Sequence, residues 1–556
     1  MSQATDISLK EFVCQHDSNF DLQAVDLHLK ESLLGKCLNE LRNSKSTEIL
    51  NALSCIRILT RDEESLDKIA SETYLERIFL YAFPDEDLKE DLAVEALKSL
   101  SNLIFKRRSV IPYLRSAGIE DKLLRRLKQH AASSSRSDVL LIDLKVFFIL
   151  TGTEPETRSE FAKNEQAFPV FADLLNTFRS TSFSETDAKL IAEALRAAYN
   201  VGYAIHHDDK LVQFHRPNFY RFVHIFRGFL IRPSVSESVH LQITSQIVNF
   251  LNVIPRRCFC KLLFSDETSS GAKSEAFRDK PVTSQPSNAV LEMKAVDVLL
   301  AFLDKQLSGM PSAVDKPAAR IDESLCPILN VLIKASQGNR KIRRYCRGKI
   351  LPKLGEDVKR LPEEGTTLRN RLCKLLTHPV QNVSEMVALL VFVLCKEDIG
   401  RAIKYTGFGN FAGFLARHSL LGRSEKKRTR VKEDKAVAAG NLTKTAQSED
   451  DSDSVDDYSS ASSESNTEEY DRLKNNVNPV TGRYEEPHSN PLEEMTEEQK
   501  EQIVMDLVRD IDKLQRSGVI RPGKVEDGRV RPVEHVLELL DDKEKSESEK
   551  SSGNSD

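Results

Sequence analysis

Hydrophobic residues along the first 422 positions recur at helical spacing. Leu, Ile, Val and Ala fall three or four residues apart over most of this stretch, and almost nothing alternates between apolar and polar residues as a strand would. Beyond Gly422 this pattern stops, and it returns as a single apolar stripe within residues 497–516. The pattern therefore predicts an all-α protein, with a large helical part over residues 1–422 and one separate helix near the carboxyl terminus.

The helical pattern also repeats itself. EALKSLSNLI at 95–104 recurs as EALRAAYNVG at 193–202, and an Ala-Leu pair returns at 52, 96, 194 and 388. These intervals fit one, two and four multiples of a period of roughly 48 residues, close to armadillo and HEAT units. The stretch 93–127, with its basic break between two apolar helices, resembles an armadillo repeat. We expect a right-handed armadillo/HEAT-like superhelix of about nine repeats, with surface insertions at 265–288 and 308–320.

Stacked repeats of this kind form a long concave groove, because each helix pair must bury its apolar face against a neighbour. Four asparagines fall in the last helix of their expected repeats, the helix that lines the groove in armadillo proteins. They are Asn102, Asn200, Asn252 and Asn330. Their amides could pair with the backbone of a bound peptide. The alternative, equally open on the sequence, is that each asparagine only caps or ties its own repeat.

The composition changes sharply after Gly422. Residues 423–435 are basic, and Ser448–Asp471 holds ten acidic residues with no Lys or Arg. Blocks of like charge stay disordered, so we expect a disordered linker over 423–477 and a disordered tail over 545–556. Ser448, Ser454 and Ser465 each have an acidic residue three positions on, the spacing preferred by acidophilic kinases of the casein kinase 2 type. These serines are predicted phosphorylation sites.

One well-specified helix follows the linker. Thr496 and Gln499 have the spacing of a capping box, and an apolar stripe follows them, made of Ile503, Val504, Leu507, Val508, Ile511 and Leu514. This predicts an amphipathic helix over 497–516 within a partner-contacting segment, 478–544. Because an isolated helix must bury its apolar stripe, the stripe is expected to pack on the repeats or on another protein.

A second basic segment lies inside the repeats. Residues 339–353 carry seven basic side chains, and five of them are candidates for docking the phosphorylated linker: Arg340, Arg343, Arg344, Arg347 and Lys349. A solvated helix face is the other interpretation. The net formal charge of −5 and the lack of interleaved aromatic residues argue against nucleic acid as the partner.

Catalytic and membrane signatures are missing from the sequence. It contains no phosphate-loop, nucleophile-elbow or zincin motif, and its longest apolar run, Val387–Cys395, is too short to span a bilayer. The nine cysteines are scattered, which favours reduced thiols. The only close pair, Cys258 and Cys260, has no second pair at zinc-finger spacing, and adjacent residues such as His206 and His207 cannot easily share a metal. We expect a cytoplasmic, monomeric protein without enzymatic activity, cofactor or metal.

Three segments together resemble the synembryn family: NPVTGRYEEPHSNPLEEMTEEQKEQ at 478–502, YTGFGNFAGFLA at 405–416 and SNTEEY at 465–470. The resemblance covers the repeats, the linker and the terminal helix in the same order. It implies a cytosolic armadillo-type protein, recruited to the cell cortex through its client. That client would be the alpha subunit of a heterotrimeric G protein, for which the protein would be a guanine-nucleotide exchange factor and folding chaperone.

The resemblance also implies a mode of action. The client's carboxy-terminal helix would enter the groove, GDP would leave, and GTP would eject the protein, while the terminal helix covers a surface near the client's switch region. RILTRD at 57–62 resembles the family, so Arg57 and Arg61 are expected on one helical face, meeting carboxylates of the client's tail. The alternative is an armadillo-type adaptor or nuclear cargo carrier, although import carriers rely on Trp-Asn arrays and this chain has no Trp.

Overall fold

The computed structural model describes most of the chain. The residues it describes are 7–43, 47–84, 89–134, 136–179, 183–232, 236–263, 293–308, 321–420, 466–486, 495–517, 523–526 and 529–532. The expected insertions, apart from Ser308, and the three predicted phosphoserines lie outside these ranges. The chain divides into two compact units, residues 1–484 and residues 485–556.

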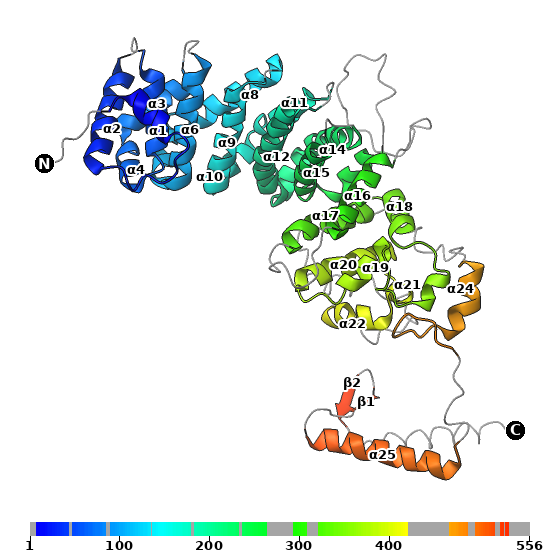
Figure 1. Cartoon of the computed structure of the whole chain (residues 1–556). Helices are drawn as coiled ribbons and strands as arrows, with labels where there is room; N and C mark the ends of the chain where they lie inside the picture. Colours follow the sequence, from blue (N-terminus) through cyan, green and yellow to red (C-terminus); the bar gives the residue numbers. More distant parts are fainter. Residues whose placement is uncertain are drawn as a thin grey trace, which may run out of the picture. The chain divides into compact units, whose positions relative to one another are not determined.

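The first unit is a helical repeat array (Figure 1). Within the described residues, seven helices pack each against the next in chain order, and we call them the ladder helices. They are α3 (Ile49–Leu59), α6 (Glu90–Lys106), α9 (Asp138–Thr153), α12 (Glu185–His206), α15 (Glu237–Leu251), α17 (Ile321–Gly338) and α20 (Gln381–Leu394). The first five begin at residues 49, 90, 138, 185 and 237, close to the expected period.

The part of the chain that the structure describes contains seven ladder helices, whereas about nine repeats were expected from length. The reason is the spacing of the later helices, which begin at residues 237, 321 and 381. A constant period therefore does not describe the later ladder helices.

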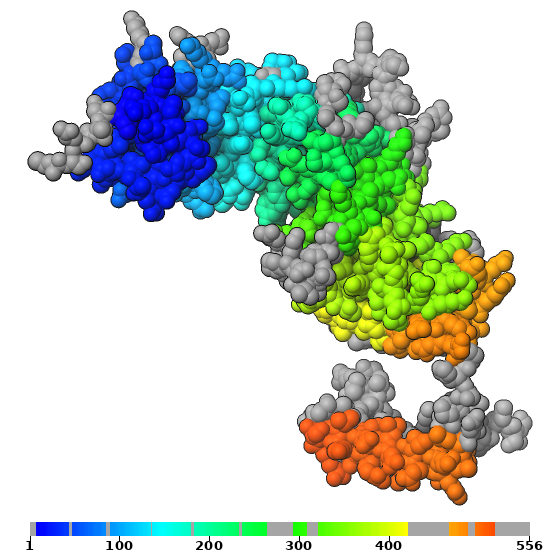
Figure 2. All heavy atoms as spheres, viewed as in Figure 1, coloured from blue at the N-terminus to red at the C-terminus, as the bar shows by residue number. Residues whose placement is uncertain are grey.

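The remaining helices of the array pack on the ladder helices and on one another. They are α1 (Leu9–His16), α2 (Leu27–Arg42), α4 (Glu63–Ile69), α5 (Glu72–Ala82), α7 (Ile111–Ser116), α8 (Ile119–Ser133), α10 (Pro155–Lys163), α11 (Ala167–Asn176), α13 (Asp209–Phe214), α14 (Arg216–Ile231), α16 (Lys294–Ser308), α18 (Arg340–Ile350), α19 (Leu368–Leu375), α21 (Ile399–Thr406) and α22 (Phe408–Arg417). Short 3-10 turns occur at Arg108–Val110, Arg256–Leu262 and Glu356–Lys359. Figure 2 shows the closely packed body that these helices form.

Phenylalanine side chains form an aromatic cluster in the centre of the array. Phe168 of α11 contacts Phe219 and Phe222 of α14 and stacks on Phe250 of α15, with ring centroids 4.8–6.4 Å apart. All four rings are fully buried. Such aromatic pairs add about 0.5–1.5 kcal/mol each beyond their burial, so this cluster holds α11, α14 and α15 firmly together.

Residues 466–484 pack on the end of the array, and we call them the latch. The latch contains α24 (Glu468–Leu473) and a 3-10 turn at Lys474–Asn476. The Phe408 and Gly409 amides donate to the carbonyls of Pro479 and Val480 at 2.8 and 2.9 Å, and the Tyr484 amide donates to Val358 at 2.6 Å. The expected boundary of the linker at 477 therefore differs from the structure. The amino-acid composition did not reveal the latch, because its first residues are acidic like the linker segment that precedes them.

The second unit contains α25 (Glu497–Arg516), with the bounds that the apolar stripe predicts. Thr496 caps the helix, and its capping box with Gln499 is complete. An antiparallel hairpin of β1 (Gly523–Glu526) and β2 (Arg529–Pro532) follows. The all-α prediction is confirmed for the described residues apart from this hairpin. Among the helices described, none combines the length and apolar character needed to span a membrane.

Candidate protein-binding surfaces

The predicted groove asparagines use their amide groups to join one ladder helix to another. Asn102 of α6 donates to Thr60 Oγ1 at the end of α3, at 2.8 Å. Asn200 of α12 is buried and donates to the Phe148 carbonyl and to Thr151 Oγ1 of α9, both at 3.0 Å. These contacts match the alternative that the sequence left open, in which each asparagine stabilises the array.

Asn252 and Asn330 make the same kind of contact between α15 and α17. Asn330 donates to Asn252 Oδ1 at 2.7 Å, and Asn252 donates to the Pro327 carbonyl at 3.2 Å. Lys334 Nζ donates to the Asn252 carbonyl at 2.8 Å, and burial, followed by the charge of Arg256, lowers the pKa of Lys334 to about 8. Asn252 is the C-cap of α15 rather than a residue inside the helix, so it differs in position from the other three.

An aromatic side chain stands three residues after two of these asparagines. Phe105 follows Asn102 on the same side of α6 and is 70% exposed, while Tyr203 follows Asn200 on α12 and is 42% exposed. The Tyr203 ring packs against His207 in a tilted arrangement, with ring centroids 4.4 Å apart. The sequence contained this signal as Asn-x-x-aromatic in NLIF and NVGY, but the apolar run around each aromatic residue concealed it.

Arg57 lies between two carboxylates. Its Nε donates to Glu95 Oε2 on α6 at 2.6 Å, and its Nη2 pairs with Asp17 Oδ1 after α1. Burial lowers the pKa of Arg57, but hydrogen bonds to Asp17 and Glu95 outweigh burial and raise it above its ordinary value. Its side chain is 15% exposed, whereas that of Asp17 is 62% exposed. The guanidinium is therefore paired within the array, and its Asp17 partner is the accessible one.

Arg61 differs from its predicted place. Helix α3 ends at Leu59 with Thr60 as its C-cap, so Arg61 lies in the following turn and not on a shared helical face with Arg57. Its guanidinium donates to three backbone carbonyls of the segment after α1, those of His16, Asp17 and Asn19, at 2.5–3.1 Å. It also lies 4.5 Å over the Phe20 ring. Sequence spacing could not reveal this arrangement, because the contacting residues are more than forty positions away.

The predicted basic helix is confirmed as α18, with Asn339 as its N-cap. Ile342, Cys346 and Ile350 are buried on one side of it, which leaves Arg340, Arg344 and Lys349 exposed and Arg343 and Arg347 half-buried. Lys349 lies 4.0 Å from Asp297, which also accepts from the Tyr345 hydroxyl at 2.6 Å. The structure thus places the five basic side chains on one helix, while the linker serines lie outside the described residues.

Helix α25 presents its apolar stripe to solvent. Ile503, Val504, Leu507 and Leu514 are exposed, Leu507 by 59%, and Val508 and Ile511 are half-buried. An apolar stripe left exposed along a helix is a feature of protein-binding sites. Because α25 is held by a complete capping box, its helical form is specified locally.

Comparisons with known proteins find sequence relatives that match most of the chain. The family described as "Guanine nucleotide exchange factor synembryn" matches residues 52–529. A relative from Xenopus laevis named "Chaperone Ric-8A" is 31% identical, covering 88% of this chain and 85% of the relative. The relative named "Chaperone Ric-8" from Drosophila melanogaster is 29% identical, covering 88% and 86%.

A solved structure, a designed armadillo repeat protein, is 13% identical and covers 65% of this chain and 99% of its own, with a TM-score of 0.24. A TM-score this low supports no conclusion about the fold, which is defined here by the packing of the helices. The family match, in contrast, extends into both units of the chain and includes the ladder helices from residue 52 onward, the latch and α25. The chain belongs to the synembryn family.

Proposed function

We propose that this protein is a guanine-nucleotide exchange factor and folding chaperone for the alpha subunits of heterotrimeric G proteins. The observation that carries the proposal is the family match across residues 52–529, which includes most of the array and all of α25. The protein binds the GDP-bound or nascent alpha subunit free of beta-gamma and holds its carboxy-terminal helix against the ladder helices. GDP then leaves, and GTP binding releases the protein.

The thermodynamics of this cycle set a requirement. The protein must bind the nucleotide-free client more tightly than the GDP and GTP forms, because a partner with equal affinity for all states shifts no equilibrium. By linkage, GTP weakens binding of the protein to the client by the same factor by which the protein weakens binding of GTP to the client. A nucleotide-free client exposes apolar surface that would otherwise aggregate, so the same preference explains both exchange and chaperone activity.

The test of α25 is a change confined to its apolar stripe. Leu507→Asp together with Ile511→Asp places carboxylates in the stripe without touching the array. We expect capture of an alpha-subunit tail peptide to persist, while GDP release from purified alpha subunits and rescue of client folding both fall about tenfold or more. The matched control is Gln502→Asp with Met505→Asp, which adds the same charge outside the stripe. Exchange at the wild-type rate in the stripe variant would refute this role for α25.

A second test concerns Arg57 and Arg61. We propose that a carboxylate of the client's tail replaces Asp17 beside Arg57. The Arg57 to Asp17 pair has one largely exposed partner, and such pairs contribute about 0.2–1 kcal/mol, so replacement costs little. Arg57→Ala with Arg61→Ala should weaken capture of the tail peptide, whereas Asp17→Asn should strengthen it about twofold to fivefold. Unchanged affinity in the folded double variant, or weaker binding in Asp17→Asn, would refute the exchange of partners.

A third proposal is regulatory. Phosphates on Ser448, Ser454 and Ser465 add about −1.5 to −2 charge each, and α18 offers the complementary cluster. We propose that docking of the phosphorylated linker on Arg340, Arg343, Arg344, Arg347 and Lys349 speeds nucleotide exchange. The gain should shrink at high salt because exposed charges are screened. Phosphorylation should no longer stimulate Arg343→Glu/Arg347→Glu, while a control reversal at Arg360 and Lys374 should keep the stimulation. Equal stimulation of all variants would exclude α18 as the receptor.

A further inference from the structure

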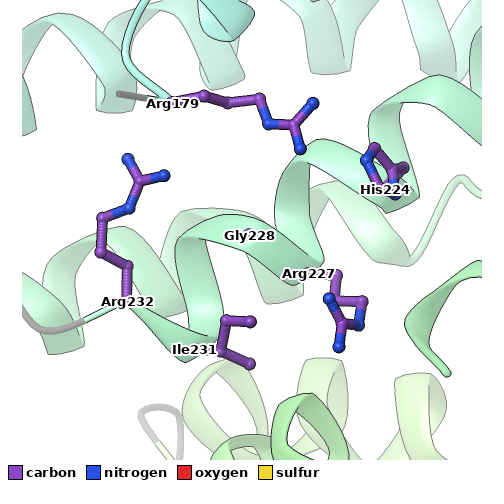
Figure 3. Close-up of a pocket in the computed structure, with 6 residues that line it drawn as sticks. All are labelled: Arg179, His224, Arg227, Gly228, Ile231 and Arg232. Atoms are coloured by element: carbon purple, nitrogen blue, oxygen red, sulfur yellow. The ribbon is translucent and has the colours of Figure 1, made fainter. Parts of the chain in front are cut away.

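A cavity of about 260 Å³ lies beside the C-terminal half of α14, away from the surfaces considered above. Six of the residues that the structure describes line it: Arg179, His224, Arg227, Gly228, Ile231 and Arg232. Figure 3 shows the Arg179 and Arg232 side chains extending over the same stretch of α14, with Gly228 between them. Among the described residues, the lining therefore contains three guanidinium groups and one imidazole but no carboxylate.

Helix α14 supplies most of the residues that line the cavity, because of their spacing along the helix. His224, Arg227, Gly228 and Ile231 are spaced three and four apart, so they share one side of α14. The opposite side carries Phe219, Phe222, Phe226 and Phe229, all fully buried. The buried aromatic side chains thus hold α14 in place, and the basic side chains project from the opposite side of a firmly packed helix.

The arginines outside that helical face are also held in place. Arg232 is the C-cap of α14, and its Nη1 donates to the Phe178 carbonyl at 2.9 Å. Its guanidinium lies 5.4 Å from the centroid of the Phe183 ring. Arg179 follows in the turn after Phe178, so one short segment anchors Arg232 and presents Arg179. The two guanidinium groups reach the cavity from different elements.

Like charges gather here in a poorly solvated setting. Arg227 is only 4% exposed. Burial lowers the pKa of Arg232, and the charge of Arg179 lowers it further, which indicates that the two cations repel each other. An anion placed among the three groups would relieve this repulsion, and in such a setting its attraction to the arginines is stronger than at an exposed surface.

Gly228 keeps the floor of the cavity open. A Cβ built on this residue would meet nothing within 4 Å, so close packing does not require a glycine here. Glycine inside a helix destabilises it by about 0.5–1 kcal/mol relative to alanine. A longer side chain at this position would therefore project into space that the glycine leaves open.

We propose that this cavity binds a compact anion bearing phosphate groups, such as a pyrophosphate or a multiply phosphorylated alcohol. Planar guanidinium groups match phosphate oxygens with paired hydrogen bonds, and each carries five donors. The volume is below the roughly 300–1,000 Å³ of pockets for drug-sized ligands, which favours a small ligand. The proposal is independent of nucleotide exchange, because it rests on α14 and the turn after α11 alone.

The test is calorimetric titration of the full chain with pyrophosphate at about 0.15 M salt, where weak surface attraction is screened. Citrate serves as a carboxylate anion of comparable charge. We expect saturable binding of pyrophosphate to the wild type, tighter than citrate. Arg179→Gln with Arg232→Gln should weaken it about tenfold or more, since charge-assisted hydrogen bonds are lost. Gly228→Leu should weaken it similarly by filling the cavity while every charge is kept.

The matched control is Arg221→Gln on the same helix. Arg221 pairs with Asp173 at 2.6 Å and does not line the cavity, so its removal should change affinity by less than about twofold. Thermal melts of all variants show whether they fold. No saturable binding to the wild type, or equal weakening by Arg221→Gln, would overturn the proposal.

A further arm identifies the source of the phosphate. Vesicles containing phosphatidylinositol bisphosphate are compared with vesicles containing only phosphatidylserine as the anionic lipid. Vesicle binding that soluble inositol trisphosphate displaces, and that the double arginine variant loses, assigns the site to a lipid headgroup. Binding of the soluble compound without vesicle binding assigns it to a free metabolite. Because the chain is tested alone, failure here leaves the proposed exchange function as it stands.

Discussion

The latch depends on a glycine, and Gly482→Ala tests what the latch does. Gly482 is buried and has φ +70°, in the left-handed region that favours glycine. A Cβ at this position would lie 2.8 Å from Pro362 Cγ and 3.1 Å from the Gly407 nitrogen. Because these neighbours belong to the array, the clash exists only while the latch is docked. The substitution therefore acts on docking and leaves the repeats intact.

The magnitude follows from two contributions. Alanine in the left-handed region costs about 1–2 kcal/mol, and displacing the latch to relieve the clash weakens hydrogen bonds worth about 0.5–1.5 kcal/mol each. The bonds at risk are those from Phe408 and Gly409 to the latch carbonyls and from Tyr484 to Val358. The total, about 2–4 kcal/mol, corresponds to a shift of the docking equilibrium by a factor of about 30–900.

Undocking also changes the reach of α25. With the latch docked, about 12 residues separate Tyr484 from α25, whereas without it the free chain after Leu420 is about 76 residues long. For a chain as flexible as the linker's composition predicts, effective concentration falls roughly with the −3/2 power of length, or about 16-fold. We therefore expect exchange on a client held at both surfaces to slow by up to about this factor.

Hydrogen exchange measures docking directly. In Gly482→Ala the amides of Phe408, Gly409 and Tyr484 should exchange at least about 30 times faster than in the wild type. The control is Gly118→Ala, where φ is +79° and an added Cβ would meet nothing within 4 Å, so it reports the backbone cost alone. If the three amides exchange as slowly in Gly482→Ala as in the wild type, the docking contacts do not limit latch opening and the reasoning fails.

Three further predictions concern the array. Asp143→Asn should destabilise the array by about 1.5–3 kcal/mol, because the half-buried Arg126 guanidinium loses the charge of its fully buried carboxylate partner. Denaturant unfolding measures this change. Burial, followed by the charge of Lys334, lowers the pKa of His206 to about 4. The stability that the neutral imidazole provides is therefore present above pH 6.5 and is lost as the pH falls toward 4. On acidification, the melting temperature of His206→Asn should fall less than that of the wild type. Asn102→Ala should destabilise the array by about 1 kcal/mol, because the hydrogen bond to Thr60 is lost. If this variant captures the tail peptide as well as the wild type does, the Asn102 amide serves only the array.

Local signals allowed α25 and the ladder helices to be predicted from sequence. The capping box at Thr496 and the stripe behind it fix a helix within a few residues, and the repeating apolar pattern fixes the ladder period. Both depend on neighbours close in the chain, which a single sequence displays. The number of repeats did not follow in the same way, because the later ladder helices of the described residues begin at wider intervals than the early ones.

The contacts of the candidate site could not be predicted in this way. Asn200 reaches residues 49 and 52 positions earlier, and Arg61 contacts a segment more than forty positions earlier. Spacing indicated that these residues were polar members of helical segments, but not which atoms they would meet. The latch was missed for a related reason: its docking depends on close backbone approach at Gly407 and Gly482, and composition does not encode that.

The pairing of Arg57 changes how the proposed client contact contributes to binding. A client carboxylate that replaces Asp17 exchanges one ion pair for another, so its net contribution to affinity is small. Such a contact sets the register and favours an acidic tail over a neutral one. Phe105 and Tyr203, in contrast, are exposed aromatic side chains whose burial would add free energy, less for Tyr203 because its ring already packs against His207. In the proposed complex the aromatic pair therefore supplies most of the affinity for the tail, and the arginines supply its selectivity.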